Sequence, residues 1–206
     1  MQKFPLIYAH RGIWENVAQQ NSQLALESAR DSDFGLETDF RSANQKLAIS
    51  HDPMLWANPV LASTLRIQDV AIALNIKEDG LGHQLKEFLS LHPNPHSFIF
   101  DGSIPEMRKI RDAGLPHALR LSEYENEIPW KTDFLWIDGF NSEWWIESPA
   151  IDALFKTHFL VFVSPELHNR PHKNAWEYFQ DMSCKGFKNF GVCTDFPQKL
   201  RELFCE

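Results

Sequence analysis

The stretch Gly35–Arg41, GLETDFR, carries the strongest indication of the fold. It reads as a strand of mainly apolar residues interrupted by Glu37 and Asp39, which stand two residues apart. Because the side chains of a strand alternate between its two faces, both carboxylates point the same way. Two carboxylates on one face of a mid-chain apolar strand are costly unless something positive pairs with them. The stretch therefore predicts a buried strand that contributes to a functional site.

Outward from this stretch, short apolar runs alternate with amphipathic segments along the whole chain. We expect eight strands, at Leu6–Ala9, Gly35–Arg41, Val70–Lys77, Ser97–Phe100, Ala118–Leu121, Phe134–Ile137, Phe159–Val163 and Phe190–Thr194. We expect helices at Gln23–Ala29, Gln84–Leu91, Pro105–Ala113, Ala150–Lys156, Asn174–Cys184 and Gln198–Phe204. Each strand precedes a helix or a connection of helix length, which predicts one domain over residues 1–206, a small α/β (β/α)₈ TIM barrel. An open doubly wound sheet is disfavoured because no glycine-rich phosphate loop accompanies the eight units.

Local signals refine the first third of the chain. Ser22 is the predicted N-cap of the first helix, whose buried stripe we expect to consist of Leu24, Leu26 and Ala29. A further extended piece, Lys46–Ser50, follows the second strand and leads into His51.

Composition limits the classes of function. The formal net charge of −8 leaves no broad basic surface, so we expect no nucleic-acid partner. Three cysteines without metal-type spacing, Cys184, Cys193 and Cys205, indicate reduced thiols. The N-terminus lacks a leader pattern, and no apolar run is long enough to cross a bilayer. We therefore expect a cytoplasmic protein without an integral membrane segment.

More polar residues gather where the early strands end, namely His10, Arg11, His51, Asn75 and Lys77. In a parallel barrel these strand ends converge on one rim, where catalytic residues of this architecture lie. A hard divalent cation, Mg²⁺ or Ca²⁺, would offset the repulsion between Glu37 and Asp39. Two histidines can exchange protons near neutral pH, and Arg11 and Lys77 supply positive charge for a phosphate. The combination favours attack at phosphorus.

The order of these residues resembles the glycerophosphodiester phosphodiesterase family, a group of metal-dependent TIM barrels. Matching motifs span nearly the whole chain: Ala9-His10-Arg11-Gly12, Gln20-Asn21-Ser22, Glu37-Thr38-Asp39, His51-Asp52, Asn75-Ile76-Lys77 and Thr194-Asp195-Phe196-Pro197. The first four together are highly specific for the family.

The resemblance implies roles for six residues: His10 and His51 as the acid–base pair, Glu37 and Asp39 as metal ligands, and Arg11 and Lys77 as phosphate contacts. In the family, a neighbouring substrate hydroxyl attacks phosphorus. One histidine accepts its proton, and the other protonates the leaving alkoxide. The implied activity is hydrolysis of a glycerophosphodiester, or of a similar small or lipid-derived phosphodiester.

Three features depart from the family pattern. The third metal ligand, a glutamate in the family, is Asn75 here, and the glutamate that opens the second motif is Gln20. Both changes make the site less acidic, which predicts weaker metal binding or a different substrate. The insert after the His-Asp motif, Pro53–Gln68, is short and indicates a more open site.

These departures leave alternatives open. Asn75 serves either as a metal ligand or as hydrogen-bonding support, and Glu166 is the first candidate for a substitute acidic ligand. One alternative function is a non-catalytic barrel that binds a phosphorylated ligand. Another is a phosphodiesterase or lyase acting on a surface-glycan precursor. Metal-dependent hydrolysis of a small phosphodiester, a small-molecule substrate, accounts for most of the motif residues and is the function we predict.

Overall fold

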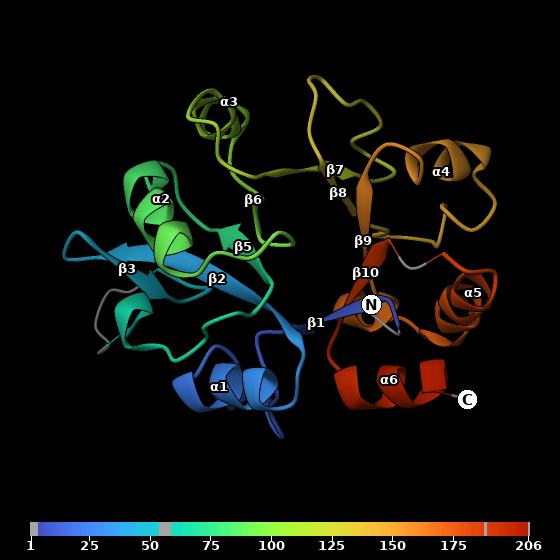
Figure 1. The fold of residues 1–206 in the computed structure, drawn as a ribbon, viewed down its shortest axis with the longest axis horizontal. Coiled ribbons are helices and arrows are strands. Elements are labelled where there is room, and N and C mark those ends of the chain that lie inside the picture. The colour runs from blue at the N-terminus through green and yellow to red at the C-terminus, as the bar shows by residue number, and fades with distance from the viewer. Residues whose placement is uncertain (1–3, 54–58, 188, 206) are drawn as a thin grey trace. The chain divides into compact units, whose positions relative to one another are not determined.

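The computed structural model describes residues 4–53, 59–187 and 189–205 of the chain (Figure 1). Two compact units make up these residues, and each is described by itself. One unit, here the 9–117 unit, runs from Ala9 to His117. The other, the 118–206 unit, consists of the chain from Ala118 onward together with the N-terminal residues up to Tyr8.

The described residues of the 9–117 unit form parallel and antiparallel strands together with three α-helices. Its elements are the end of β1 (Leu6–His10), η1 (Val17–Gln19), α1 (Gln23–Asp31), β2 (Gly35–Ala43), β3 (Lys46–Ile49), β4 (Val60–Leu61), η2 (Ala62–Thr64), β5 (Ile72–Ile76), α2 (Gly82–Leu91), β6 (Phe98–Phe100) and α3 (Ile104–Asp112). Strand β2 pairs in parallel with β5, and β5 in parallel with β6. On the other edge, β3 pairs antiparallel with both β2 and β4. Helix α2 packs against β3 and, through the Phe88 and Phe40 rings, against β2 (Figure 1).

The 118–206 unit repeats the alternation of parallel strands and helices. Its elements are β7 (Ala118–Leu121), β8 (Phe134–Ile137), α4 (Pro149–Leu154), β9 (Phe159–Val163), η3 (Pro165–His168), α5 (Lys173–Cys184), β10 (Phe190–Thr194) and α6 (Pro197–Cys205). Strands β7, β8, β9 and β10 pair in parallel in that order. The connection between β7 and β8, residues 122–133, has the length of a helix but contains none.

Each of the eight expected strands has a counterpart within a few residues of its expected position. The protein is therefore a mixed α/β structure with a parallel-rich sheet, as the alternation predicts. Within the insert Pro53–Gln68, residues 54–58 lie outside the described part, and the remainder contributes β4 and η2.

The start of α1 follows the predicted capping, but its buried face differs from the prediction at one residue. The Ser22 hydroxyl accepts a hydrogen bond from the Ala25 backbone N–H, which confirms Ser22 as the cap of α1. The expectation that Leu24 is buried was wrong, because its side chain is 74% exposed. Ala25 takes its place beside Leu26 and Ala29. One helical residue turns the side chain by about 100°, which carries position 24 away from the face that positions 25 and 29 share.

The strands next to the candidate site are buried on both faces. Every residue of β5 is buried, as are the first six of β2, which suits strands covered on both sides. In the described part of the chain, none of the helices has the length and apolar character needed to cross a membrane.

Candidate active site

The two acidic residues of β2 lie next to β5 in a register that joins them to Asn75. In the parallel ladder Asp39 stands opposite Asn75, and Glu37 lies two residues earlier on β2. The Asn75 amide Nδ2 donates to Glu37 Oε1 at 3.0 Å. Glu37 is 1% exposed and Asp39 is fully buried. The expected strand with two inward carboxylates is thus present.

A tight turn after β1 brings Arg11 to this strand. Arg11 and Gly12 have φ values of +56° and +91°, and the Arg11 backbone N–H donates to the carbonyl of Glu37 at 2.9 Å. A Cβ atom at position 12 would lie 2.5 Å from the carbonyl carbon of Ala25. Only glycine combines this backbone conformation with so close an approach to α1. The turn therefore explains the glycine of the His-Arg-Gly motif.

Three side chains surround the Asp39 carboxylate. Arg11 Nε lies 2.9 Å from Oδ2, and Lys77 Nζ lies 3.3 Å from Oδ1. Asn21 Nδ2 donates to Oδ2 at 2.7 Å. A carboxylate without access to water needs such partners, because burial otherwise disfavours its charged form.

Asn21 is a site residue for which the sequence indicated no role. Besides binding Asp39, its Oδ1 accepts the hydroxyl proton of Thr38 at 2.7 Å. Its neighbour Gln20 accepts a hydrogen bond from Arg11 Nη1 at 3.0 Å. In the sequence, only the Gln-Asn-Ser motif pointed to this residue. In the structure, Gln20 of the motif hydrogen-bonds to the Arg11 side chain and Asn21 to the Asp39 side chain.

Glu37 is the less stabilised of the two carboxylates. Burial raises its pKa above the ordinary value, and the negative charge of Asp39 raises it further. The charges of His10 and Arg11 and the Asn75 hydrogen bond act in the opposite direction. The His10 Nε2 atom lies 3.8 Å from Glu37 Oε2. A cation near Glu37 would therefore relieve an unfavourable charge.

Three buried oxygens test whether this site suits a metal. Glu37 Oε2, Asp39 Oδ1 and Asn75 Oδ1 have no hydrogen-bond partner within the described part of the chain. Asp39 Oδ1 does lie within ion-pair distance of Lys77, although without the geometry of a hydrogen bond. No group of three or more His, Cys, Asp or Glu side chains gathers among the described residues, so a third protein ligand here would be an amide. Two carboxylates and one amide oxygen are ligands suited to Mg²⁺ or Ca²⁺, and this donor set fits such an ion.

Lys77 follows β5 and lies between two carboxylates. Its backbone N–H donates to the Phe40 carbonyl at 3.0 Å, which extends the β2–β5 pairing past the end of β5. Its Nζ atom lies 3.3 Å from Asp39 and 3.5 Å from Asp101. The sequence had left Asp101 without a role, as one of several polar residues near strand ends.

His51 stands apart from the other predicted residues. It follows β3, and its side chain is 49% exposed. Its Nδ1 atom lies 2.8 Å from Asp52 Oδ1. The hydrogen bond from His51 and then its charge lower the pKa of Asp52, and Arg11 and Arg41 contribute smaller effects of the same sign. In the described part of the chain, no hydrogen bond or ion pair joins the His51 side chain to the other six predicted residues.

Glu166, the candidate substitute ligand, has partners of its own within the 118–206 unit. Its carboxylate accepts hydrogen bonds from the hydroxyls of Ser164 and Thr194 and from the Asp195 backbone N–H. His172 Nδ1 lies 3.8 Å away. Both Glu166 oxygens thus already accept hydrogen bonds, whereas Asn75 Oδ1 accepts none within the described residues. Asn75 is therefore the better candidate of the two for a third ligand.

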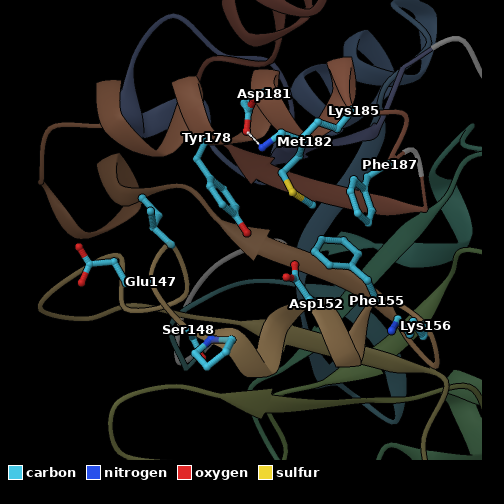
Figure 2. A pocket seen from close by; sticks show the side chains of 12 residues that line it. Glu147, Ser148, Asp152, Phe155, Lys156, Tyr178, Asp181, Met182, Lys185 and Phe187 are labelled. Carbon is cyan, nitrogen blue, oxygen red and sulfur yellow. Dashed lines mark hydrogen bonds and ion pairs between the residues drawn. The ribbon is translucent and has the colours of Figure 1, made fainter.

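A separate hollow of about 680 Å³ lies in the 118–206 unit (Figure 2). Phe155, Tyr178, Met182 and Phe187 line it, and Figure 2 shows the Asp152 carboxylate pointing toward Tyr178 and Phe155. Burial, followed by the charges of Asp152 and Asp181, raises the pKa of Tyr178 to about 12. None of the seven predicted site residues lines this hollow.

Comparison with known proteins connects this geometry to a solved fold. No protein-family model and no curated protein matches the chain. Among solved structures, it is similar to the crystal structure of glycerophosphodiester phosphodiesterase from Agrobacterium tumefaciens str. C58. The TM-score is 0.66 at 13% sequence identity, and the match covers 97% of this chain and 100% of the other. At this identity the likeness is one of fold: the chain shares the fold of a glycerophosphodiester phosphodiesterase.

Proposed function

We propose that this protein is a metal-dependent phosphoric diester hydrolase built on a (β/α)₈ barrel. Its substrate is a glycerophosphodiester or a similar small or lipid-derived phosphodiester. The observation that carries the proposal is the convergence of six predicted residues in the 9–117 unit: His10, Arg11, Glu37, Asp39, Asn75 and Lys77. The shared fold supports it, and the free cysteines agree with action in the cytoplasm.

In this proposal Glu37, Asp39 and Asn75 would hold a Mg²⁺ or Ca²⁺ ion through the three oxygens that have no hydrogen-bond partner among the described residues. A bound divalent ion supplies Lewis-acid stabilisation of charge on phosphoryl oxygens. The charge balance also requires it. Two cationic side chains, Arg11 and Lys77, stand against three carboxylates when Asp101 is included. With these groups alone the site is net negative, and a divalent cation held there would reverse its sign and favour an anionic phosphodiester.

Arg11 and Lys77 bind the phosphate. Their charged groups converge on opposite oxygens of Asp39 and are only partly exposed, at 21% and 17% of their side chains. Arginine offers a planar fork to phosphate oxygens, and lysine offers a compact charge. Asp39 and Gln20 keep the Arg11 side chain in place before the substrate arrives, which lowers the entropy lost on binding.

His10 and His51 transfer the protons. The neighbouring hydroxyl of the substrate attacks phosphorus, one imidazole accepts its proton, and the other gives a proton to the departing alkoxide as the phosphorus–oxygen bond breaks. Water then attacks the resulting cyclic phosphate with the two proton transfers reversed, which opens the ring and completes the hydrolysis. Glu37 lies beside His10, and Asp52 orients His51 through its Nδ1 atom. Each imidazole therefore has a carboxylate close to one of its ring nitrogens.

The test is hydrolysis of an aryl phosphodiester and of a glycerophosphodiester by pure protein, with Mg²⁺ or Ca²⁺ and with a chelator. We expect metal-dependent turnover that is lost in His10→Ala and kept in His83→Ala, a variant of an exposed histidine in the same unit. Phosphorus NMR of the products separates hydrolysis from release of a cyclic phosphate. A folded protein that binds metal and phosphate but turns over neither substrate would instead be a binding protein.

A further inference from the structure

Arg41 occupies a position that the motifs do not explain. It follows Glu37 and Asp39 at the same two-residue spacing in β2, so it extends their row on one face of the strand. Its side chain is only 15% exposed. An arginine that is so little exposed needs hydrogen-bond or ion-pair partners, because burying a guanidinium without them is costly.

The guanidinium of Arg41 forms two hydrogen bonds with the backbone of His51. Both Nε and Nη2 donate to the His51 carbonyl oxygen, at 3.1 and 3.0 Å. The remaining Nη1 atom lies 3.5 Å from Glu78 Oε2, and the other oxygen of Glu78 accepts the Ser42 backbone N–H at 2.7 Å. The arginine is thus anchored to its own strand through Glu78 while it holds a residue of the following segment.

These two hydrogen bonds lie just beyond the end of the β2–β3 pairing. Arg41 stands opposite Ala48 in the β2–β3 ladder, and the last backbone hydrogen bond joins the Ser50 N–H to the Asp39 carbonyl at 3.0 Å. His51 comes next, beyond the ladder. Among the described residues, the other hydrogen bonds of this segment are the one between the His51 ring and the exposed Asp52 and the one from the Ser50 hydroxyl to the Asp52 carbonyl. Within that part of the chain, Arg41 is thus the side chain that hydrogen-bonds to the His51 backbone.

We propose that Arg41 is a positioning residue for His51: it fixes the segment that presents this imidazole, and Glu78 fixes Arg41. The inference rests on the proposed function, in which His51 transfers a proton. Arg41 acts through the backbone of His51, so its loss weakens proton transfer and leaves phosphate and metal binding as they are. Lysine cannot replace it fully, because one ammonium group does not reproduce the rigid guanidinium, which places two N–H groups on the His51 carbonyl oxygen and a third toward Glu78.

The experiment compares Arg41→Met and Arg41→Lys with wild type in kcat, KM and metal affinity. We expect kcat to fall roughly 100-fold in Arg41→Met and about 10-fold in Arg41→Lys, with KM and the metal Kd unchanged, because a small displacement of a catalytic group has effects of this size. In a His51→Ala background, Arg41→Met should cause no further loss. Arg30→Met is the matched control, because Arg30 also donates to a backbone carbonyl in this unit, that of Arg66.

A second measurement is independent of turnover. The ring carbon–proton signal of His51 in NMR should shift and broaden in Arg41→Met and stay unchanged in Arg30→Met. An unchanged His51 signal would overturn the proposal whatever the activity. Normal kcat in Arg41→Met alongside a damaged His51→Ala would overturn the positioning role and leave the proposed function standing. A raised KM at constant kcat would make Arg41 a substrate contact instead. Normal turnover in His51→Ala would overturn the role of His51 and with it that of Arg41.

Discussion

Replacing Asn75 by glutamate places a second carboxylate against Glu37 in the buried end of β5. The Asn75 amide now donates to Glu37 at 3.0 Å, and this bond would become a contact between two negative charges. Two unit charges 3 Å apart repel by about 5 kcal/mol at an effective dielectric constant of 20. Protonation of one carboxyl limits the penalty, so we expect the metal-free variant to lose a few kcal/mol of stability at pH 7.

The same charge should tighten metal binding. The added carboxylate attracts the ion, and binding also relieves the repulsion, so both effects act in one direction. We expect Mg²⁺ and Ca²⁺ affinity to rise at least about tenfold, or roughly 1.4 kcal/mol. Turnover should slow, because extra negative charge opposes an anionic phosphate and its more highly charged transition state.

We would measure metal affinity by titration calorimetry with both ions and stability by thermal melts with and without chelator. Turnover would be measured in parallel. Asn75→Gln is the matched control, because glutamine has the length of glutamate without its charge. If the glutamate and glutamine variants are folded and bind both metals equally, position 75 does not face the cation, and the assigned ligand set is wrong.

Three further outcomes are expected. Replacing His10 or His51 by alanine should each lower kcat about 10²–10⁴-fold, and replacing both should cost far less than the product, as steady-state kinetics would show; strictly multiplicative losses would contradict a joint role. Gly12→Ala should destabilise the protein by several kcal/mol in chemical unfolding, because its Cβ would meet the Ala25 backbone at 2.5 Å; an unchanged midpoint would refute this. The pKa of Glu123 is lowered: its modest burial raises the pKa, but hydrogen bonds from the backbone N–H groups of residues 140–142 outweigh that effect. Glu123→Gln should therefore cost about 1 kcal/mol of stability above the ordinary glutamate pKa and progressively less as the pH falls through the lowered one; a loss independent of pH in urea unfolding would count against the assignment.

The sequence by itself was sufficient for the elements and for the residues of the motifs. Strand positions such as β5 and β10 follow from runs of apolar residues, and the start of α1 follows from Ser22, because periodicity and capping depend on neighbours in the chain. The same local rule pairs Glu37 with Asp39 on one face of β2. The assignment of Leu24 to the buried face failed, because which side of a helix meets the sheet depends on packing against distant residues.

Only the tertiary structure decided how the site is held together. Asn21 reaches Asp39, and Arg41 reaches the carbonyl of His51, although 18 and 10 residues separate the partners. These contacts depend on the left-handed turn after β1 and on the registers of β2 with β5 and β3. A strand shifted by one residue would send each of these side chains to the opposite face, and nothing in the local pattern specifies that shift. The motif residues can therefore be identified from the sequence, but the residues that hold them become visible only once the chain is folded.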